Sequence, residues 1–431
     1  MLKPLFESKD IRKLLFDAKS VKHNLSRYNV SLNLPYDDVL IMAYLTDANR
    51  NFKALDDLMN TYNVESDSKA AAMFSLEKSI MCQLEERNIK DLYYTMEMPL
   101  IEILFDMEKQ GFSVDKEKLK ELSDKFKIEI EDLKKKIYEI AGEEFNLNSP
   151  KQLGVILFDK LGLPSGKSKS TSVDVLNDLI YMHPIIELVL RYREIEKLRS
   201  TYLDGMVPLV DKEGKIHTIF KQTVTATGRL SSTEPNLQNI PVRKEEGKQI
   251  RGMFTASQGN TLVCADYSQV ELRLMAAFSG DDTMIDAFNS GVDIHATTAS
   301  RIFNIPISLV TQDIRRQAKA VNFGIIYGIT DFGLSKDMGI TVKKAKEFIN
   351  NYFERFPKVH QYMNKLVNDA QKTGYAITLF GRRRYIPELT MSNHNMQNFG
   401  KRVAMNMPLQ GTASDIIKIA MINVYKKMKE N

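Results

Sequence analysis

An aspartate that directly follows an apolar run is the first candidate for chemistry in this sequence. Residues 261–265 read Thr-Leu-Val-Cys-Ala, and Asp266 follows them just before a helix-forming segment. Such a run predicts a buried strand. A carboxylate at the end of a buried strand is held rigidly and can bind a divalent cation, which prefers oxygen ligands. Taken alone, Asp266 could equally cap the helix that follows it.

Four residues at steps of four form the second candidate. On a helix of 3.6 residues per turn each step drifts by only about 40°, so Arg315, Lys319, Phe323 and Tyr327 form one stripe. Two cations followed by two aromatic rings can bind a triphosphate and the sugar or base attached to it. The alternative is a solvated helix face that happens to carry aromatic residues.

The composition excludes several classes of protein. The 431 residues carry a formal net charge of +5, which permits a polyanionic partner without proving one. The two cysteines, Cys82 and Cys264, cannot form a disulfide framework or a zinc site, and Cys264 is expected to be a buried apolar residue. There is no apolar run of about 18 residues and no signal-peptide pattern at the start. Secreted, membrane-embedded and disulfide-stapled classes are therefore disfavoured.

The elements that must position these residues are mostly helical. Residues 1–92 read as a small α/β unit, and helical spacing of apolar residues predicts helices over 96–112 and 114–141. Ser149 and Pro150 predict the start of a further helix. Residues 217–224 predict a strand, and helix dominates after Asp266.

Four ordered blocks carry a family resemblance: residues 225–241, 266–273, 313–328 and 402–412. Together they resemble the family A DNA polymerases, the bacterial polymerase I group. The resemblance implies an α+β multidomain fold, a right-hand polymerase preceded by a ribonuclease H-like exonuclease domain. The expected limits are 1–92 for the exonuclease-like domain, which is incomplete at its N-terminus, and 93–431 for the polymerase. Within the latter, the thumb is expected at about 105–200, the palm at about 201–275 and 396–431, and the fingers at about 276–395.

The resemblance also implies residue roles for DNA-templated addition of dNTPs to a primer 3′ end. Asp266, with the Tyr267 carbonyl, would hold two Mg²⁺ ions, and Lys319 would protonate the leaving pyrophosphate. Glu271, held by Tyr327, would exclude a 2′-hydroxyl, and Phe323 would pack on the sugar and reject dideoxynucleotides. The expected nucleotide-binding residues are Arg315, Lys319, Phe323, Tyr327, His295, Glu271 and Gln269. The expected DNA-binding residues are Arg229, Asn236, Gln238, Asn239, Arg402, Asn406 and Gln410.

Two departures from the family qualify this interpretation. Family members carry a His-Asp-Glu motif with a second metal-binding aspartate, but the six histidines here are followed by Asn, Pro, Thr, Ala, Gln and Asn. The sequence is therefore expected to be a fragment, or to have its remainder encoded separately. It is expected to lack the C-terminal part of the palm and to be impaired alone. The alternative function is a non-catalytic fragment that binds primer–template DNA.

The second departure lies in the exonuclease-like segment. Asp37 and Asp38 are present, but Val21 stands where a second acidic motif is expected, and residues 73–75 lack the third. One acidic cluster cannot assemble a two-metal nuclease site, so this domain is expected to be inactive and structural.

Other classes fit less well. Glu271 argues against a single-subunit RNA polymerase, which must admit a 2′-hydroxyl, and no helix-turn-helix or zinc motif indicates a DNA-binding regulator. The expected partners are primer–template DNA and dNTP, with no membrane, for a monomer in the bacterial cytoplasm, at the nucleoid or in a phage-infected cell. The run Arg382-Arg383-Arg384 is expected to be solvated or to contact phosphates.

Overall fold

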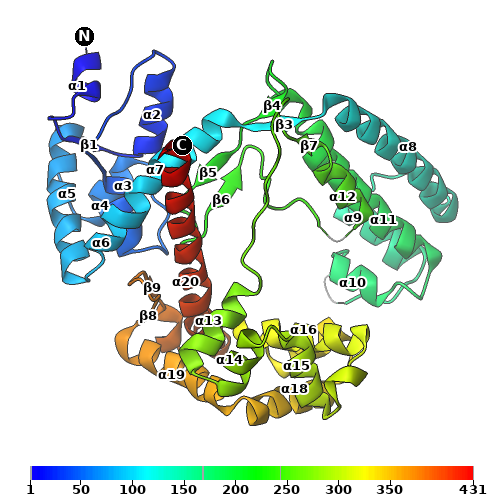
Figure 1. Ribbon diagram of the computed structural model, residues 1–431. Coiled ribbons are helices and arrows are strands. Elements are labelled where there is room, and N and C mark those ends of the chain that lie inside the picture. The colour runs from blue at the N-terminus through cyan, green and yellow to red at the C-terminus, as the bar shows by residue number, and fades with distance from the viewer. Residues whose placement is uncertain (1, 167–168, 243, 431) are drawn as a thin grey trace. The chain divides into compact units, whose positions relative to one another are not determined.

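Helices account for most of the residues that the structure describes, and the strands are short (Figure 1). The computed structural model describes residues 2–166, 169–242 and 244–430. The chain divides into two compact units, each assembled from separate segments. Unit 1 comprises Met1–Met107, Lys221–Ser231 and Ala265–Asn431, and unit 2 comprises Glu108–Phe220 and Ser232–Cys264.

The N-terminal segment of unit 1 is the small α/β arrangement that the sequence predicts. Strands β1 and β2 pair in parallel, with Leu15 opposite Asp38. Helix α3 is buried at every position, because it is apolar all round and is enclosed by its neighbours. The elements are α1 (Lys3–Glu7), β1 (Lys13–Leu15), α2 (Ala18–Ser26), β2 (Tyr36–Asp38), α3 (Val39–Thr46), α4 (Leu55–Thr61), α5 (Lys69–Glu86), α6 (Lys90–Leu92), a π-helical turn at Tyr93–Glu97, and α7 (Met98–Gln110), whose last three residues belong to unit 2.

The remainder of unit 1 is a helical assembly around its own core. Apolar residues of α13 to α19 form this core, and Leu409 of the long helix α20 joins it. Helix α20 contains Pro408. The elements are α13 (Val270–Ser279), α14 (Asp282–Asn289), α15 (Ile294–Phe303), α16 (Gln312–Ile326), α17 (Asp331–Met338), α18 (Val342–Arg355), α19 (Pro357–Thr373), the antiparallel pair β8 (Tyr375–Ile377) and β9 (Arg383–Tyr385), and α20 (His394–Glu430).

Unit 2 is built on two long helices, α8 (Lys116–Ala141) and α11 (Pro184–Leu198). The apolar stripe expected at 114–141 is buried from Leu119 to Ile137. Ser149 caps α9 by accepting a hydrogen bond from the Gln152 amide, and Pro150 follows it, as predicted. The other elements are α9 (Pro150–Gly154), a π-helical turn at Val155–Lys160, α10 (Val173–Asp178), a π-helical turn at Arg199–Asp204, α12 (Glu245–Arg251), the sheet β4 (Lys215–Ile216), β3 (Phe112–Val114) and β7 (Phe254–Thr255), and the pair β5 (Ile219–Lys221) and β6 (Ser231–Thr233), each with one end residue in unit 1.

Two expectations are wrong. Residues 261–265 form no strand, and the whole stretch is exposed, including Cys264, which was expected to be buried. The physical reason is that a strand exists only through hydrogen bonds to a neighbour, and no strand of the described residues pairs with this segment. Separately, no described helix combines the length and the apolar character needed to cross a bilayer.

Candidate functional site

Helix α16 presents the predicted stripe opposite its buried face. Thr311 caps the helix, since its hydroxyl accepts a hydrogen bond from the Ile314 amide at 3.3 Å. Val321 and Ile325 pack into the core of unit 1. Lys319 is exposed, and its ammonium lies 5.8 Å from the centre of the Phe323 ring. A cation and a ring therefore lie together on the open side of the helix.

Asp293 orients the first cation of the stripe. Its Oδ2 accepts hydrogen bonds from Nε and Nη2 of Arg315 at 2.8 and 2.6 Å. Its Oδ1 accepts from the His295 and Ala296 amides, so the same carboxylate caps α15. Burial alone would raise the pKa of Asp293, but the Arg315 guanidinium and these amides hold it below its usual range. The Arg315 guanidinium remains about one-third exposed, which leaves it accessible to an anion.

His295 is buried beside the stripe. Its ring centre lies 5.7 Å from that of Phe323, and its Nδ1 is 3.0 Å from Nδ2 of Asn322. The Asn322 carbonyl oxygen accepts from the Thr298 hydroxyl, so its amide group donates to Nδ1 and the ring proton lies on Nε2. Burial, aided by the charges of Arg315 and Lys319, lowers the pKa of His295 to about 4. His295 is therefore an uncharged donor at neutral pH, and Asn322, which the sequence did not single out, sets its tautomer.

Glu271 links helix α13 to two other parts of unit 1. The residue lies in the first turn of α13 and is 6 % exposed. Oε1 binds Nη2 of Arg229 at 2.5 Å, and Oε2 accepts a hydrogen bond from the Tyr327 hydroxyl at 2.8 Å. Burial and the adjacent Glu271 carboxylate raise the pKa of Tyr327 to about 12, so the phenol remains a donor. The predicted contact between Glu271 and Tyr327 is confirmed. Gln269, in the left-handed conformation at φ +54°, immediately precedes this helix.

Asp266 lies in an exposed, irregular stretch before α13. Tyr267 is also exposed. Among the described residues, no group of three or more His, Cys, Asp or Glu side chains could hold a metal ion. A two-ion centre needs several shared oxygen ligands. The residues present therefore do not fit the pair of Mg²⁺ ions that the sequence predicts.

Helix α20 carries three predicted DNA-binding residues at steps of four, Arg402, Asn406 and Gln410. They share one face because i and i+4 positions are neighbours on a helix. The turn after α16 packs against this helix, because a Cβ on Gly328 (φ +64°) would lie 2.9 Å from Cγ of Arg402. Oδ1 of Asn406 is buried and has no hydrogen-bond partner within the described residues. An unpaired buried acceptor of this kind is rare and marks a position where a ligand or water can donate.

The remaining predicted DNA-binding residues Asn236, Gln238 and Asn239 belong to unit 2 and follow β6. The side chain of Asn236 accepts from the Gln238 amide at 3.0 Å, and the Asn239 carbonyl accepts from the Tyr202 hydroxyl at 2.6 Å. These hydrogen bonds fix the backbone conformation of the loop at residues 236–239 within unit 2.

A buried ionic cluster lies in unit 1 where the sequence predicted a solvated arginine run. Arg382 is 1 % exposed, so that expectation is wrong for this residue. Its guanidinium pairs with Glu97 and with Oδ1 of Asp415, the latter at 2.8 Å, and Lys418 binds Glu97 at 2.7 Å. Burial alone would raise the pKa of Glu97, but Lys418 and Arg382 hold it at about 2. The available sequence signal was Asp415 and Lys418, one turn apart among the apolar residues of α20.

The cluster supports the loop that carries Arg229. Gly228, at φ +82°, lies against Arg382: a Cβ there would be 2.6 Å from the arginine Nε. The Thr225 carbonyl accepts from the Tyr44 hydroxyl at 2.7 Å, and the Thr225 hydroxyl donates to the Arg229 carbonyl at 2.6 Å. Arg382 and Tyr44 thus hold the loop at residues 225–229 in place, so that the Arg229 guanidinium reaches the Glu271 carboxylate.

Comparison with known proteins identifies the family. The model of DNA polymerase family A matches residues 116–431, and that of the ribonuclease H-like domain of DNA polymerase I matches residues 1–73. The chain belongs to DNA polymerase family A. The predicted fold is confirmed: a right-hand polymerase preceded by a ribonuclease H-like domain.

Individual family A polymerases are similar along the whole chain. DNA polymerase I of Caldicellulosiruptor bescii is 44 % identical over 98 % of this chain and 51 % of its own length. DNA polymerase I of Geobacillus stearothermophilus is 44 % identical over 97 % and 52 %. A solved structure, the POL domain of Pol1 from M. smegmatis in complex with DNA primer–template and dNTP, is 38 % identical, with a TM-score of 0.93 over 100 % of this chain and 78 % of that one. The chain spans about half the length of the curated relatives it matches.

The two acidic residues of the ribonuclease H-like segment are engaged in structure. Asp37 pairs with Arg12 at 2.6 Å and accepts from the Tyr93 hydroxyl at 3.0 Å. Asp38 caps α3 by accepting from the Leu40 amide at 2.9 Å and also accepts from the Ala18 amide at 2.7 Å. Burial raises the pKa of Asp38 to about 7. Both residues are buried, and both carboxylates already accept hydrogen bonds from other groups of the protein.

Proposed function

We propose that the protein is a DNA-templated DNA polymerase module that selects deoxynucleotides opposite a template base. The observation that carries this proposal is the arrangement of Glu271, held by Tyr327 and Arg229, in the same unit as the cation-and-ring face of α16. A rigid carboxylate below a sugar leaves no room for a 2′-hydroxyl, and the cations of α16 suit the triphosphate. The family membership supports the same conclusion.

The proposed roles follow from charge and exposure. Arg315 and Lys319 bind the triphosphate, His295 donates to it from Nε2, and Phe323 packs on the sugar. Lys319 donates the proton to the leaving pyrophosphate, since it is the exposed cation of the stripe. Gln269 is also assigned to nucleotide binding. DNA contacts are assigned to Arg229, Asn236, Gln238, Asn239, Arg402, Asn406 and Gln410, and the unpaired Oδ1 of Asn406 supports this assignment on α20.

Catalysis by residues 1–431 is proposed to be slow. Asp266 and the Tyr267 carbonyl are the candidate Mg²⁺ ligands, and the sequence has no His-Asp-Glu segment to add a second aspartate. Residues 1–431 are therefore expected to bind primer–template DNA and dNTP while extending the primer poorly. The alternative, a purely DNA-binding fragment, differs in having no nucleotide specificity. The exonuclease-like segment is proposed to be structural, because Asp37 and Asp38 are already engaged.

Binding of a fluorescent primer–template, followed by dNTP titration, tests the proposal. DNA affinity should fall steeply with salt, because Lys and Arg displace condensed counterions. Lys319→Ala should weaken binding of the matching dNTP by about tenfold, the effect expected for one charge-assisted hydrogen bond. Arg316→Ala is the matched control, since Arg316 is on the same helix and 80 % exposed, and pairs only with Asp313 within the described chain. Equal binding of matched and mismatched dNTP would contradict the polymerase proposal, whereas primer extension at a normal rate would contradict the slow catalysis proposed for residues 1–431.

A further inference from the structure

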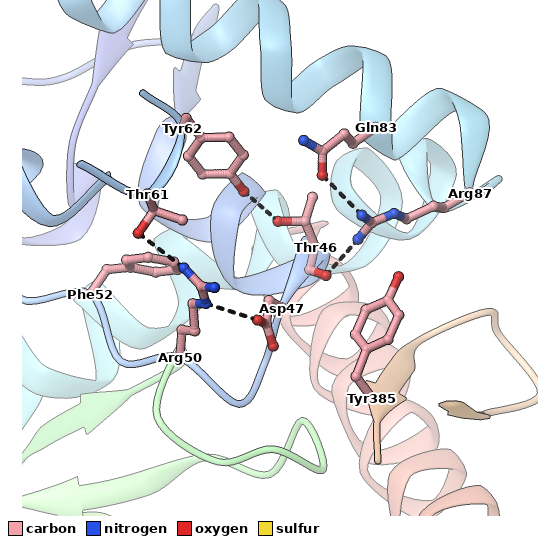
Figure 2. A pocket seen from close by; sticks show the side chains of 9 residues that line it. All are labelled: Thr46, Asp47, Arg50, Phe52, Thr61, Tyr62, Gln83, Arg87 and Tyr385. Carbon is pink, nitrogen blue, oxygen red and sulfur yellow. Dashed lines mark hydrogen bonds and ion pairs between the residues drawn. The ribbon is translucent and has the colours of Figure 1, made fainter. Parts of the chain in front are cut away.

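A polar pocket lies in unit 1 away from the residues assigned above. It occupies about 300 Å³ between the end of α3, the loop that follows, α4, the end of α5 and strand β9. Figure 2 shows two guanidiniums, Arg50 and Arg87, directed into it from different segments, with the Tyr385 ring beside Arg87. The acidic residues Asp37 and Asp38 do not line it. The pocket is therefore distinct from any remnant of a nuclease site.

The two arginines have donors to spare. Arg87 uses Nη1 on the Thr46 carbonyl at 2.5 Å and Nη2 on the Gln83 side chain at 3.0 Å. Arg50 uses Nη1 on the Thr61 hydroxyl at 3.2 Å and Nε on Asp47 at 3.1 Å. Each guanidinium has five N–H donors, so these contacts orient it without exhausting it. The pocket is held in shape and remains rich in donors.

Acceptors in the pocket are already engaged. Asp47 accepts from Arg50 through Oδ2 and from the Asn49 amide through Oδ1. The Thr46 hydroxyl donates to the Ala43 carbonyl, so the Tyr62 hydroxyl must donate to Thr46. With two arginines and one aspartate, the lining carries a net charge of +1. The positive net charge and the spare N–H donors favour an anion with several acceptor oxygens. Phosphate is such an anion, and the planar arginine fork binds it through two parallel hydrogen bonds.

Aromatic rings supply a second contact. Phe52, Tyr62 and Tyr385 line the pocket, and the guanidinium of Arg87 lies 5.5 Å from the Tyr385 ring centre. The volume is at the lower end of small-molecule sites. We propose that this pocket binds a nucleoside monophosphate, with the phosphate on Arg50 and Arg87 and the base against the aromatic wall.

Isothermal titration of the full chain with dAMP tests the proposal, with ribose 5-phosphate, inorganic phosphate and deoxyadenosine as comparison ligands. Arg50→Ala should raise the dissociation constant for dAMP by about tenfold or more, from loss of charge-assisted hydrogen bonds. Arg50 is half exposed, so the variant should fold. Arg87→Lys keeps the charge and removes the planar fork, and should also weaken binding.

Two control variants show whether dAMP binds in this pocket or elsewhere. Lys53→Ala removes the same charge from an exposed residue that does not line the pocket and should leave dAMP binding unchanged. Lys319→Ala should also leave it unchanged, because that residue belongs to the proposed dNTP site. The proposal is overturned if wild type binds no dAMP at millimolar concentration, or if Lys319→Ala rather than Arg50→Ala abolishes binding. Equal affinity for inorganic phosphate would overturn the assignment to a nucleotide.

Discussion

The Tyr327 hydroxyl donates a hydrogen bond to Oε2 of Glu271 over 2.8 Å, while Arg229 binds the other carboxylate oxygen. The buried carboxylate is thus fixed from both sides. Glu271→Ala should admit ribonucleotides, lowering the ratio of dNTP to rNTP affinity by about tenfold or more. Tyr327→Phe should lower it less, because the Glu271 carboxylate remains and keeps its contact with Arg229. Titration of dATP and ATP onto the DNA complex measures this. An unchanged ratio in Glu271→Ala would contradict the assigned role.

Phe323 allows a test of sugar recognition in which a single hydroxyl group is added. Its ring packs between His295 and Lys319 on the open face of α16. Phe323→Tyr adds one hydroxyl where the 3′ position of the sugar is expected, so it should reduce the discrimination against dideoxynucleotides. Competition between dTTP and ddTTP for the DNA complex gives the ratio. Phe332→Tyr, an exposed position on α17, is the control and should leave the ratio unchanged.

His295 predicts a pH dependence of stability. Its pKa falls from 6.5 to about 4 on folding, so between these values the unfolded chain holds a proton that the folded chain does not. The free energy of unfolding should therefore fall as the pH drops below 6.5, by about 2 kcal/mol between pH 7 and pH 5, and be insensitive to this group above pH 6.5.

Urea unfolding of His295→Gln measures this effect, because the variant should lose that part of the slope. His394→Gln is the matched control: His394 also contacts an asparagine amide, Asn398 at 3.1 Å, but is exposed. Its variant should keep the wild-type dependence. A wild-type slope in His295→Gln would show that another group is responsible.

The buried Arg382 cluster predicts a large stability effect. Arg382→Ala leaves buried Asp415 without the guanidinium that pairs with it, and leaves Glu97 paired with Lys418 but not with Arg382, which should cost about 3–5 kcal/mol. Gly228→Ala should destabilise through both its positive φ and its contact with Arg382, by about 1–3 kcal/mol. Urea unfolding measures both. Gly374→Ala has a similar φ of +80° with nothing within 4 Å, so it isolates the backbone component and should cost less than Gly228→Ala.

The ribonuclease H-like segment should show no exonuclease activity. The Asp38 carboxylate accepts hydrogen bonds from backbone amides at the start of α3. Asp38→Ala should therefore lower the free energy of unfolding by about 1 kcal/mol, as the loss of a helix cap does. A labelled primer incubated with Mg²⁺ should keep its 3′ nucleotide with both wild type and variant. Magnesium-dependent shortening that disappears in Asp38→Ala would contradict the structural role.

The sequence by itself determined the features that depend on local periodicity and on motif order. The stripe of α16, the buried stripe of α8 and the cap at Ser149 all follow from residues within a few turns of one another. The contact between Glu271 and Tyr327 was predicted from the family resemblance, which four ordered blocks carried. The assigned roles in DNA and nucleotide binding, and the domain limits, stay predictions.

Only the tertiary structure decided the features that depend on distant partners. Arg382 lies in a run of arginines that the sequence predicts to be solvated, yet its partner Glu97 is 285 residues away. Burial of the Arg382 guanidinium becomes favourable only when folding brings it to the carboxylates of Glu97 and Asp415. Residues 261–265 have strand propensity, but a strand also needs a hydrogen-bonded neighbour, which propensity cannot supply. Periodicity is a property of one segment, whereas pairing of charges and of strands is a property of segments that folding brings together.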